Sequence, residues 1–155
     1  MPLTIDRITL RFEDNGKFHD DLILRVGQEA WRCDSYYLLL DRGLLPEQED
    51  AGKVSAVLQH LLDQWHQAVE SLPDGGVCFL PYDFSDQYTA WLRCQAQGFN
   101  LLVQRGWAQI EGWRVMPSMV GELFKSVPGF REDGPVYEIS RGEFLRSLEY
   151  RAGAK

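Results

Sequence analysis

The sequence predicts an α+β fold with a mainly antiparallel sheet, packed on one face by a long amphipathic helix, and with two shorter C-terminal helices. Strand-like segments cluster in runs near both ends of the chain instead of alternating with helices. A single long stretch between these runs repeats its apolar residues every three and four positions. Short connections join the later strand-like segments, as they do in antiparallel sheets. With 155 residues, we expect one globular domain over 1–155.

The first element that we expect is a β-hairpin. Residues 3–12, LTIDRITLRF, have strand composition, and residues 21–26, DLILRV, alternate apolar and other side chains. Asn15 and Gly16 between them are typical of a hairpin turn, because both accept a positive φ at low cost. Gly27 predicts a β-bulge, after which the strand resumes.

Residues 34–50 leave three alternatives open: a strand, a short helix or a packed loop. Gly43 and Pro46 interrupt this segment. Acidic residues over 47–50 predict the start of a helix, where negative charge is favoured.

The long helix is the clearest element in the sequence. Its end is set by the Pro-Asp-Gly-Gly sequence at 73–76. A helix with one apolar face is expected to lie on a sheet. The apolar repeat consists of Val54, Val57, Leu58, Leu61, Leu62, Trp65, Val69 and Leu72.

Three strands in a meander are expected next, over 77–82, 88–97 and 99–110. Connections this short join antiparallel neighbours. Beyond them, Ser118 is expected to cap a helix that extends to Val127.

The sequence PVYEIS at 135–140 is expected to form a last strand. Ser140 and Glu143 then match the S-x-x-E capping box, which predicts a final helix.

Charge and cysteine content narrow the classes of partner and compartment. The 23 acidic and 16 basic residues give a formal charge of −7, which disfavours nucleic acids and anionic membranes and favours a basic partner. The three cysteines form no C-x-x-C pair, which fits a reducing compartment. Asp6 and Arg7 stand where a signal peptide needs apolar residues, and the longest apolar run, 36–40, is too short to cross a bilayer. We therefore expect a cytoplasmic protein.

The segment DFSDQY, residues 83–88, comes closest to chemistry. Asp83, Ser85 and Asp86 offer oxygen ligands for a hard cation, but a calcium loop brings more carboxylates and a glycine. Asp and Ser also satisfy nearby amides in turns. We expect these groups to close a chain reversal without converging with distant side chains into a reactive pocket, and to serve as a contact surface.

Other candidate motifs are weaker. His19, Asp20 and Asp21 form a triplet of residue types that bind metals, yet the other two histidines, His60 and His66, lie on different faces of the long helix. The sequence around Gly52 lacks the outer residues of a phosphate loop. Cys78 and Cys94 lie inside apolar strands, as small buried hydrophobes do, and Cys33 is less certain. We expect no catalytic residue, no metal site and no cofactor.

Tryptophans suggest a contact surface beside the acidic loop. Trp65 falls in the helical repeat and is expected in the core, whereas Trp107 and Trp113 follow glycines near a strand end and a turn. Exposed tryptophans are common anchors of interfaces. Glu111 can pair with Arg114 or with a basic partner. The predicted partner-binding residues are Asp83, Asp86, Tyr88, Trp107, Glu111 and Trp113.

A compact acidic α+β domain without a catalytic set resembles the small proteins that bacteria use to inhibit or accompany a partner, such as immunity proteins against toxins. This resemblance implies a non-catalytic protein-binding or inhibitory module that engages a basic protein surface. Two alternatives stay open: a metal-assisted hydrolase that uses the acidic loop at 83–86, and a homo-oligomeric accessory subunit such as a homodimer.

Overall fold

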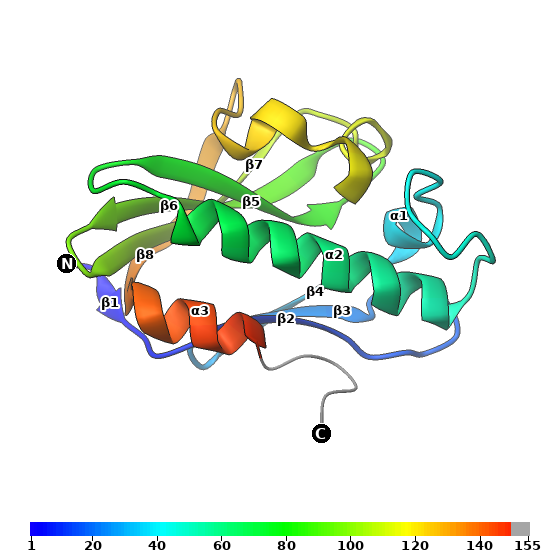
Figure 1. Ribbon diagram of the computed structural model, residues 1–155, viewed down its shortest axis with the longest axis horizontal. Helices are drawn as coiled ribbons and strands as arrows, with labels where there is room; N and C mark the ends of the chain where they lie inside the picture. Colours follow the sequence, from blue (N-terminus) through cyan, green and yellow to red (C-terminus); the bar gives the residue numbers. More distant parts are fainter. Residues whose placement is uncertain (150–155) are drawn as a thin grey trace.

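Eight strands and three α-helices lie within residues 1–149, the part of the chain that the computed structural model describes (Figure 1). The strands form two sheets, so the expected mixed fold with antiparallel sheets is present, but the single sheet implied by the sequence is divided. The five-stranded sheet has the order β1 (Leu3–Thr4), β8 (Arg131–Ser140), β7 (Asn100–Ala108), β6 (Thr89–Gln97), β5 (Val77–Phe84). The three-stranded sheet has the order β2 (Ile8–Phe12), β3 (Leu22–Val26), β4 (Glu29–Cys33).

Neighbouring strands are antiparallel except β1 and β8, which pair in parallel. The very short β1 thus pairs the start of the chain with the last strand, β8, and the chain then passes into the other sheet at β2 (Figure 1). The alternation of apolar residues along a strand shows which residues share a face, but it does not show which strands pair with each other. The division into two sheets was therefore not predicted.

The first hairpin is confirmed, with a longer loop than expected. β2 and β3 pair from Ile8 with Val26 to Phe12 with Leu22, and residues 13–21 connect them. The prediction of a bulge at Gly27 was wrong. Gly27 has a φ of 59° and lies in the two-residue turn between β3 and β4, where an added Cβ would lie 2.8 Å from Ile5 Cγ2.

Residues 34–50 contain a short helix, α1 (Tyr36–Leu39), and a loop that leads to the long helix α2 (Ala51–Glu70). The predicted start of α2 is confirmed, since the Asp50 carboxylate accepts the backbone N–H of Lys53 at 3.1 Å as an N-cap. Trp65 is fully buried, as expected, and its Nε1 donates to the carbonyl of Pro81 in β5 at 3.1 Å. α2 also contacts β2 and α3 (Arg141–Glu149), beside which it runs in Figure 1.

The meander of β5, β6 and β7 is confirmed, and each strand pairs with its sequence neighbour. The four-residue loop 85–88 joins β5 to β6, and the Ser85 N–H donates to the Tyr88 carbonyl at 3.0 Å. The prediction that Ser140 and Glu143 begin α3 is also confirmed: the Glu143 N–H donates to Ser140 Oγ, and the Ser140 hydroxyl, in place of its backbone N–H, donates to Glu143 Oε1, both at 3.0 Å.

The prediction of a helix capped by Ser118 was wrong. Residues 112–124 instead form three 3₁₀ turns, η1 (Gly112–Arg114), η2 (Pro117–Met119) and η3 (Gly121–Phe124). Gly121, with a φ of 53°, breaks the helical path. The N–H of Ser118 donates to Oδ2 of the buried Asp41 at 2.8 Å, so this residue ties two distant segments together.

No helix in the described residues combines the length and the apolar character that a membrane crossing needs.

Candidate functional site

Two irregularities in the five-stranded sheet direct polar side chains into one hollow. On β5 the register shifts between Pro81 and Asp83, so Tyr82 is an additional residue relative to β6. Between β7 and β8 the register shifts at Arg105. Bulges redirect side chains locally and are frequent beside functional sites. Tyr82, Asp83 and Arg105 all line the resulting cavity.

We call this cavity the Arg105 hollow. Its volume is about 600 Å³, and it lies where the end of β4 meets the five-stranded sheet. Ala90 on β6 has Asp83 and Trp107 as its cross-strand partners, so a small side chain stands between a carboxylate and an indole. The lining residues that the following paragraphs use are Trp31, Cys33, Tyr82, Asp83, Tyr88, Ala90, Arg105 and Trp107.

The carboxyl group of Asp83 is substantially buried in this hollow. Burial raises its pKa to about 6, and the negative charge of Asp34 acts in the same direction. The Tyr88 hydroxyl donates to Asp83 Oδ2 at 3.2 Å and partly opposes that rise. The Tyr88 ring meets Trp107 edge to face, with 6.3 Å between the ring centroids. Three residues that the sequence singled out, Asp83, Tyr88 and Trp107, are therefore neighbours.

Arg105 brings an opposite charge into the same hollow. Its guanidinium carbon lies 3.8 Å from the centroid of the Trp31 ring, in cation–π geometry. Its Nη1 lies 3.5 Å from the Tyr82 hydroxyl, the outer limit of a hydrogen bond. Its Nε is buried and has no hydrogen-bond partner within residues 1–149. In that part of the chain no ion pair joins Arg105 to a carboxylate.

The thiol of Cys33 also lines the hollow, and it is not activated. Burial raises its pKa well above the ordinary value, and the nearby Asp83 charge adds to the effect. A thiol that stays protonated is a poor nucleophile, because the thiolate is the reactive form. Cys78 and Cys94 are buried in the sheet, as expected, and all three thiols are free.

The remaining predicted residues lie outside the hollow, on the adjoining surface. Asp86 accepts a hydrogen bond from the Tyr37 hydroxyl of α1. The backbone of Asp34 likewise contacts Asp83. These groups close the reversal between β5 and β6, and Asp83 and Asp86 also contact the end of β4 and α1.

Glu111 and Trp113 flank Gly112, whose backbone lies close to that of the acidic loop. The Gly112 N–H donates to the Ser85 carbonyl at 2.6 Å, which places residues 111–114 against the acidic loop. Glu111 forms the expected ion pair with Arg114, at 3.1 Å. The side chain of Trp113 is half exposed and lines a second hollow together with Tyr37.

Residues 19–21, which precede β3, form polar contacts with Asp34 and Ser35, which follow β4. His19 Nδ1 lies 3.5 Å from Asp34 Oδ2, the Asp20 N–H donates to Asp34 Oδ1 at 2.9 Å, and the buried Asp21 accepts from the N–H and hydroxyl of Ser35. No group of three or more His, Cys, Asp or Glu side chains within the described residues is arranged to hold a metal ion.

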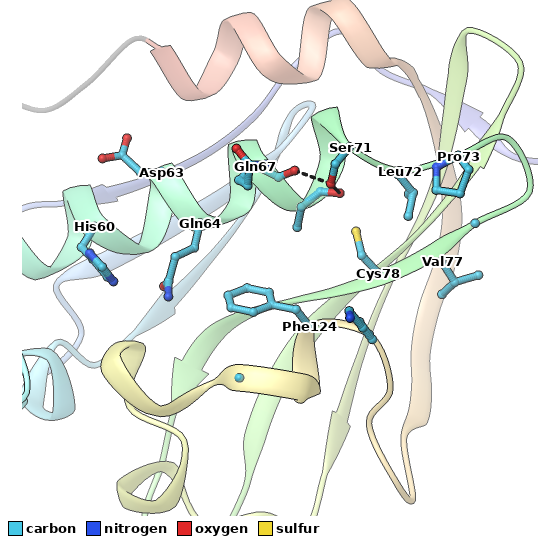
Figure 2. A pocket seen from close by; sticks show the side chains of 14 residues that line it. His60, Asp63, Gln64, Gln67, Ser71, Leu72, Pro73, Val77, Cys78 and Phe124 are labelled. Carbon is cyan, nitrogen blue, oxygen red and sulfur yellow. Dashed lines mark hydrogen bonds between the residues drawn. The ribbon is translucent and has the colours of Figure 1, made fainter.

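A larger and more apolar hollow, about 780 Å³ in volume, lies between α2, the start of β5 and η3 (Figure 2). Gln64 and Cys78 line it, and Phe124 faces α2 across it. None of the residues predicted to bind a partner lines this cavity.

Sequence reasoning missed Arg105, Tyr82 and Trp31. A signal for Arg105 existed, because it occupies an inward position between Val103 and Trp107 in an otherwise apolar alternation. A bulge such as that at Tyr82 leaves no comparable pattern in one sequence.

No protein-family model matches this chain, and neither a curated protein nor a solved structure is similar enough to match it.

Proposed function

We propose that this chain is a non-catalytic protein-binding or inhibitory module that engages a basic surface of another protein. The proposal is supported by one arrangement: acidic and aromatic side chains from four chain segments lie near one another where β4, α1 and the loops after β5 and β7 meet. We call this surface the acidic rim. It comprises Asp20, Asp34, Tyr36, Tyr37, Asp86, Glu111 and Trp113.

Contacts link the central members of the acidic rim, and Trp113 adjoins them through the hollow that it lines together with Tyr37. His19 pairs with Asp34 and stacks on Tyr36, with 5.8 Å between their rings. Tyr36 meets Tyr37 edge to face at 5.4 Å, and Tyr37 donates to Asp86. Because four chain segments hold these side chains, the acidic rim is a preorganised surface, which lowers the entropy lost on binding.

The chemistry of the acidic rim suits a cationic partner. Carboxylates attract lysine and arginine side chains, and Tyr and Trp rings supply both apolar area and cation–π contacts. The net charge of −7 steers association with a basic surface in the same direction. Asp83, Tyr88 and Trp107 stand beside the acidic rim and extend it into the Arg105 hollow.

The supporting scaffold and compartment form part of this proposal. We propose that α2 covers one face of the mainly antiparallel sheet, which the buried Trp65 and its hydrogen bond to Pro81 support. Three free, buried thiols fit a reducing compartment such as the bacterial cytoplasm. The proposed resemblance to immunity proteins rests only on the acidic charge and the α+β fold of a small chain.

The test is co-purification with the product of the adjacent gene, followed by calorimetry. The triple variant Asp86→Ala, Glu111→Ala, Trp113→Ala is expected to weaken binding at least about tenfold. A matched control carries the same charge change and loses an aromatic elsewhere: Glu70→Ala, Glu122→Ala, Phe99→Ala, all exposed. Equal affinity of both triple variants would contradict the acidic rim as the binding surface.

The same preparation separates the two alternatives. A metal-assisted hydrolase predicts a rise in melting temperature with divalent cations that Asp83→Asn abolishes. A homo-oligomeric subunit predicts a light-scattering mass that is a multiple of 17.9 kDa without any partner.

A further inference from the structure

We propose that the Arg105 hollow is a binding site for an organic carboxylate, whose two oxygens are held by the Arg105 guanidinium while Trp31, Trp107 and Tyr88 enclose its apolar part. This proposal does not rest on the proposed function. The acidic rim would bind cationic side chains, whereas the guanidinium of Arg105, which is not part of the rim, would bind an anion, although Tyr88 and Trp107 adjoin both surfaces.

Arg105 has donors that the protein leaves unused. A guanidinium offers five N–H groups in a fixed planar array. In the described residues, one long contact to the Tyr82 hydroxyl at 3.5 Å engages Nη1, and the buried Nε has no partner. A carboxylate supplies two acceptors in the geometry that matches the N–H groups of the two terminal nitrogens, Nη1 and Nη2, of a guanidinium.

Arg105 is also held in place before any ligand arrives. Its guanidinium stacks on Trp31 from the other sheet, and the register shift beside β8 directs it into the hollow. A Cβ added at Gly134, whose φ is 115°, would lie 3.6 Å from Arg105 Nη2, so the connecting backbone passes close to the cation. A fixed cation loses little conformational entropy when it binds an anion.

The neighbouring carboxylate of Asp83 does not form an ion pair with Arg105. It accepts the Tyr88 hydroxyl and a backbone hydrogen bond from Asp34, and no ion pair to Arg105 lies within the described residues. The hollow thus combines a free cation with the hydroxyl groups of Tyr82 and Tyr88. The Tyr82 hydroxyl, which accepts from Arg105, has its own hydrogen available to donate to the ligand, whereas the Tyr88 hydroxyl already donates to Asp83.

The size and walls of the cavity favour a ligand with a flat apolar part. A volume of about 600 Å³ lies within the range of small-molecule sites, and two indoles and two phenols line it. A guanidinium without an ion-pair partner in residues 1–149 suits one carboxylate better than a phosphate dianion, because Asp83 and Asp133 in the same lining would repel the second charge.

The experiment is calorimetry of the full chain with five probes: benzoate, its neutral analogue benzamide, inorganic phosphate, and a Phe-ended tetrapeptide with either a free or an amidated C-terminus. Benzoate or the free-acid tetrapeptide is expected to bind at least about tenfold more tightly than its neutral analogue. Preference for benzoate identifies a small free acid as the ligand, and preference for the tetrapeptide identifies a chain end. Equal binding of acid and neutral analogue, tighter binding of phosphate than of either acid, or no saturable binding overturns the proposal.

Variants connect the binding to Arg105. Arg105→Gln is expected to reduce the affinity for the preferred acid at least about tenfold. Arg105→Lys keeps the charge but loses the planar array, so its affinity is expected to lie between those of the wild type and Arg105→Gln. Arg93→Gln is the matched control, because Arg93 lies on the next strand and on the opposite face of the sheet. Unchanged affinity in a folded Arg105→Gln protein, as judged by its thermal melt, would overturn the proposal.

Failure of this proposal is distinguishable from failure of the proposed function. The triple variant in the acidic rim should bind the preferred acid like the wild type, since its three residues do not line the Arg105 hollow. If Arg105→Gln itself fails to fold, NMR of the wild type provides the test. Benzoate is expected to change the chemical shift of the indole N–H of Trp31 or Trp107, and benzamide is not; equal effects of the two would overturn the proposal.

Discussion

Ser118 and Asp41 are joined by two hydrogen bonds, from the backbone N–H and the hydroxyl of Ser118 to the two carboxylate oxygens of Asp41. The Gly43 N–H donates to the same carboxylate at 3.0 Å, and the side chain of Asp41 is fully buried. This one acid therefore connects the loop after α1 to η2, and it determines the path of the segment that carries Trp113.

Removing this carboxylate should destabilise the protein strongly. Asp41→Ala removes a buried carboxylate that accepts three part-buried hydrogen bonds from Gly43 and Ser118, so we expect the free energy of unfolding to fall by about 2 to 4 kcal/mol. Urea denaturation followed by tryptophan fluorescence measures the change. Asp6→Ala at an exposed position is the control and should change stability by less than about 0.5 kcal/mol. Similar losses in the two variants would show that Asp41 does not anchor η2.

The elements that the sequence predicted best are those specified by local signals. The α2 start at Asp50, the capping box before α3 and the meander all depend on residues within a few positions of one another. The role of Ser118 could not be predicted in this way, because its partner Asp41 is 77 residues distant. A helix-capping residue and a residue that bonds a distant carboxylate have the same appearance in a sequence.

The capping box offers a local test of the same principle. Ser140→Ala removes the acceptor of the Glu143 N–H, and we expect a loss of about 1 kcal/mol. Ser140→Asp retains an acceptor and should keep most of the stability. The measurement is again urea denaturation, and equal loss in both variants would mean that the side-chain oxygen does not stabilise α3.

The candidate site was predicted in part. Asp83, Tyr88 and Trp107 meet in one hollow because β5, β6 and β7 are adjacent, which the short connections indicated. Arg105 and Trp31 meet there because the two sheets come together at that point, and no pattern in one sequence reports the packing of one sheet on another.

Gly112 should be indispensable for the position of the acidic rim. An added Cβ would lie 2.7 Å from the backbone carbon of Phe84 and the nitrogen of Ser85, and backbone atoms cannot move aside cheaply. We expect Gly112→Ala to lower the free energy of unfolding by about 1 to 3 kcal/mol and to shift the indole resonance of Trp113.

The matched glycine variant is Gly142→Ala in the first turn of α3. Its nearest neighbour is the flexible end of Arg146 at 3.3 Å, and alanine favours the helix. Stability should stay the same or rise by up to about 1 kcal/mol. If Gly112→Ala is as well tolerated as Gly142→Ala, residues 111–114 do not pack on the loop as described.

The raised pKa of Asp83 makes stability depend on pH in a defined direction. Burial raises this pKa from 3.8 to about 6, so the folded protein holds the proton more tightly than the unfolded chain does. The resulting stabilisation is complete below about pH 4 and is lost as pH rises through 6. A rise of two pKa units corresponds to about 3 kcal/mol.

Asp83→Asn isolates this contribution, because asparagine keeps an acceptor for the Tyr88 hydroxyl and does not titrate. The free energy of unfolding of the variant minus that of the wild type should increase between pH 4 and pH 6 and become constant above about pH 7, by up to about 3 kcal/mol. Burial also raises the pKa of Asp21, which stays in both proteins and cancels in the difference. Urea denaturation at pH 4.5, 6.0 and 7.5 provides the measurement, with Asp6→Asn as the control for an exposed acid. A difference that is independent of pH would mean that the Asp83 carboxyl is solvated and does not face the Arg105 hollow.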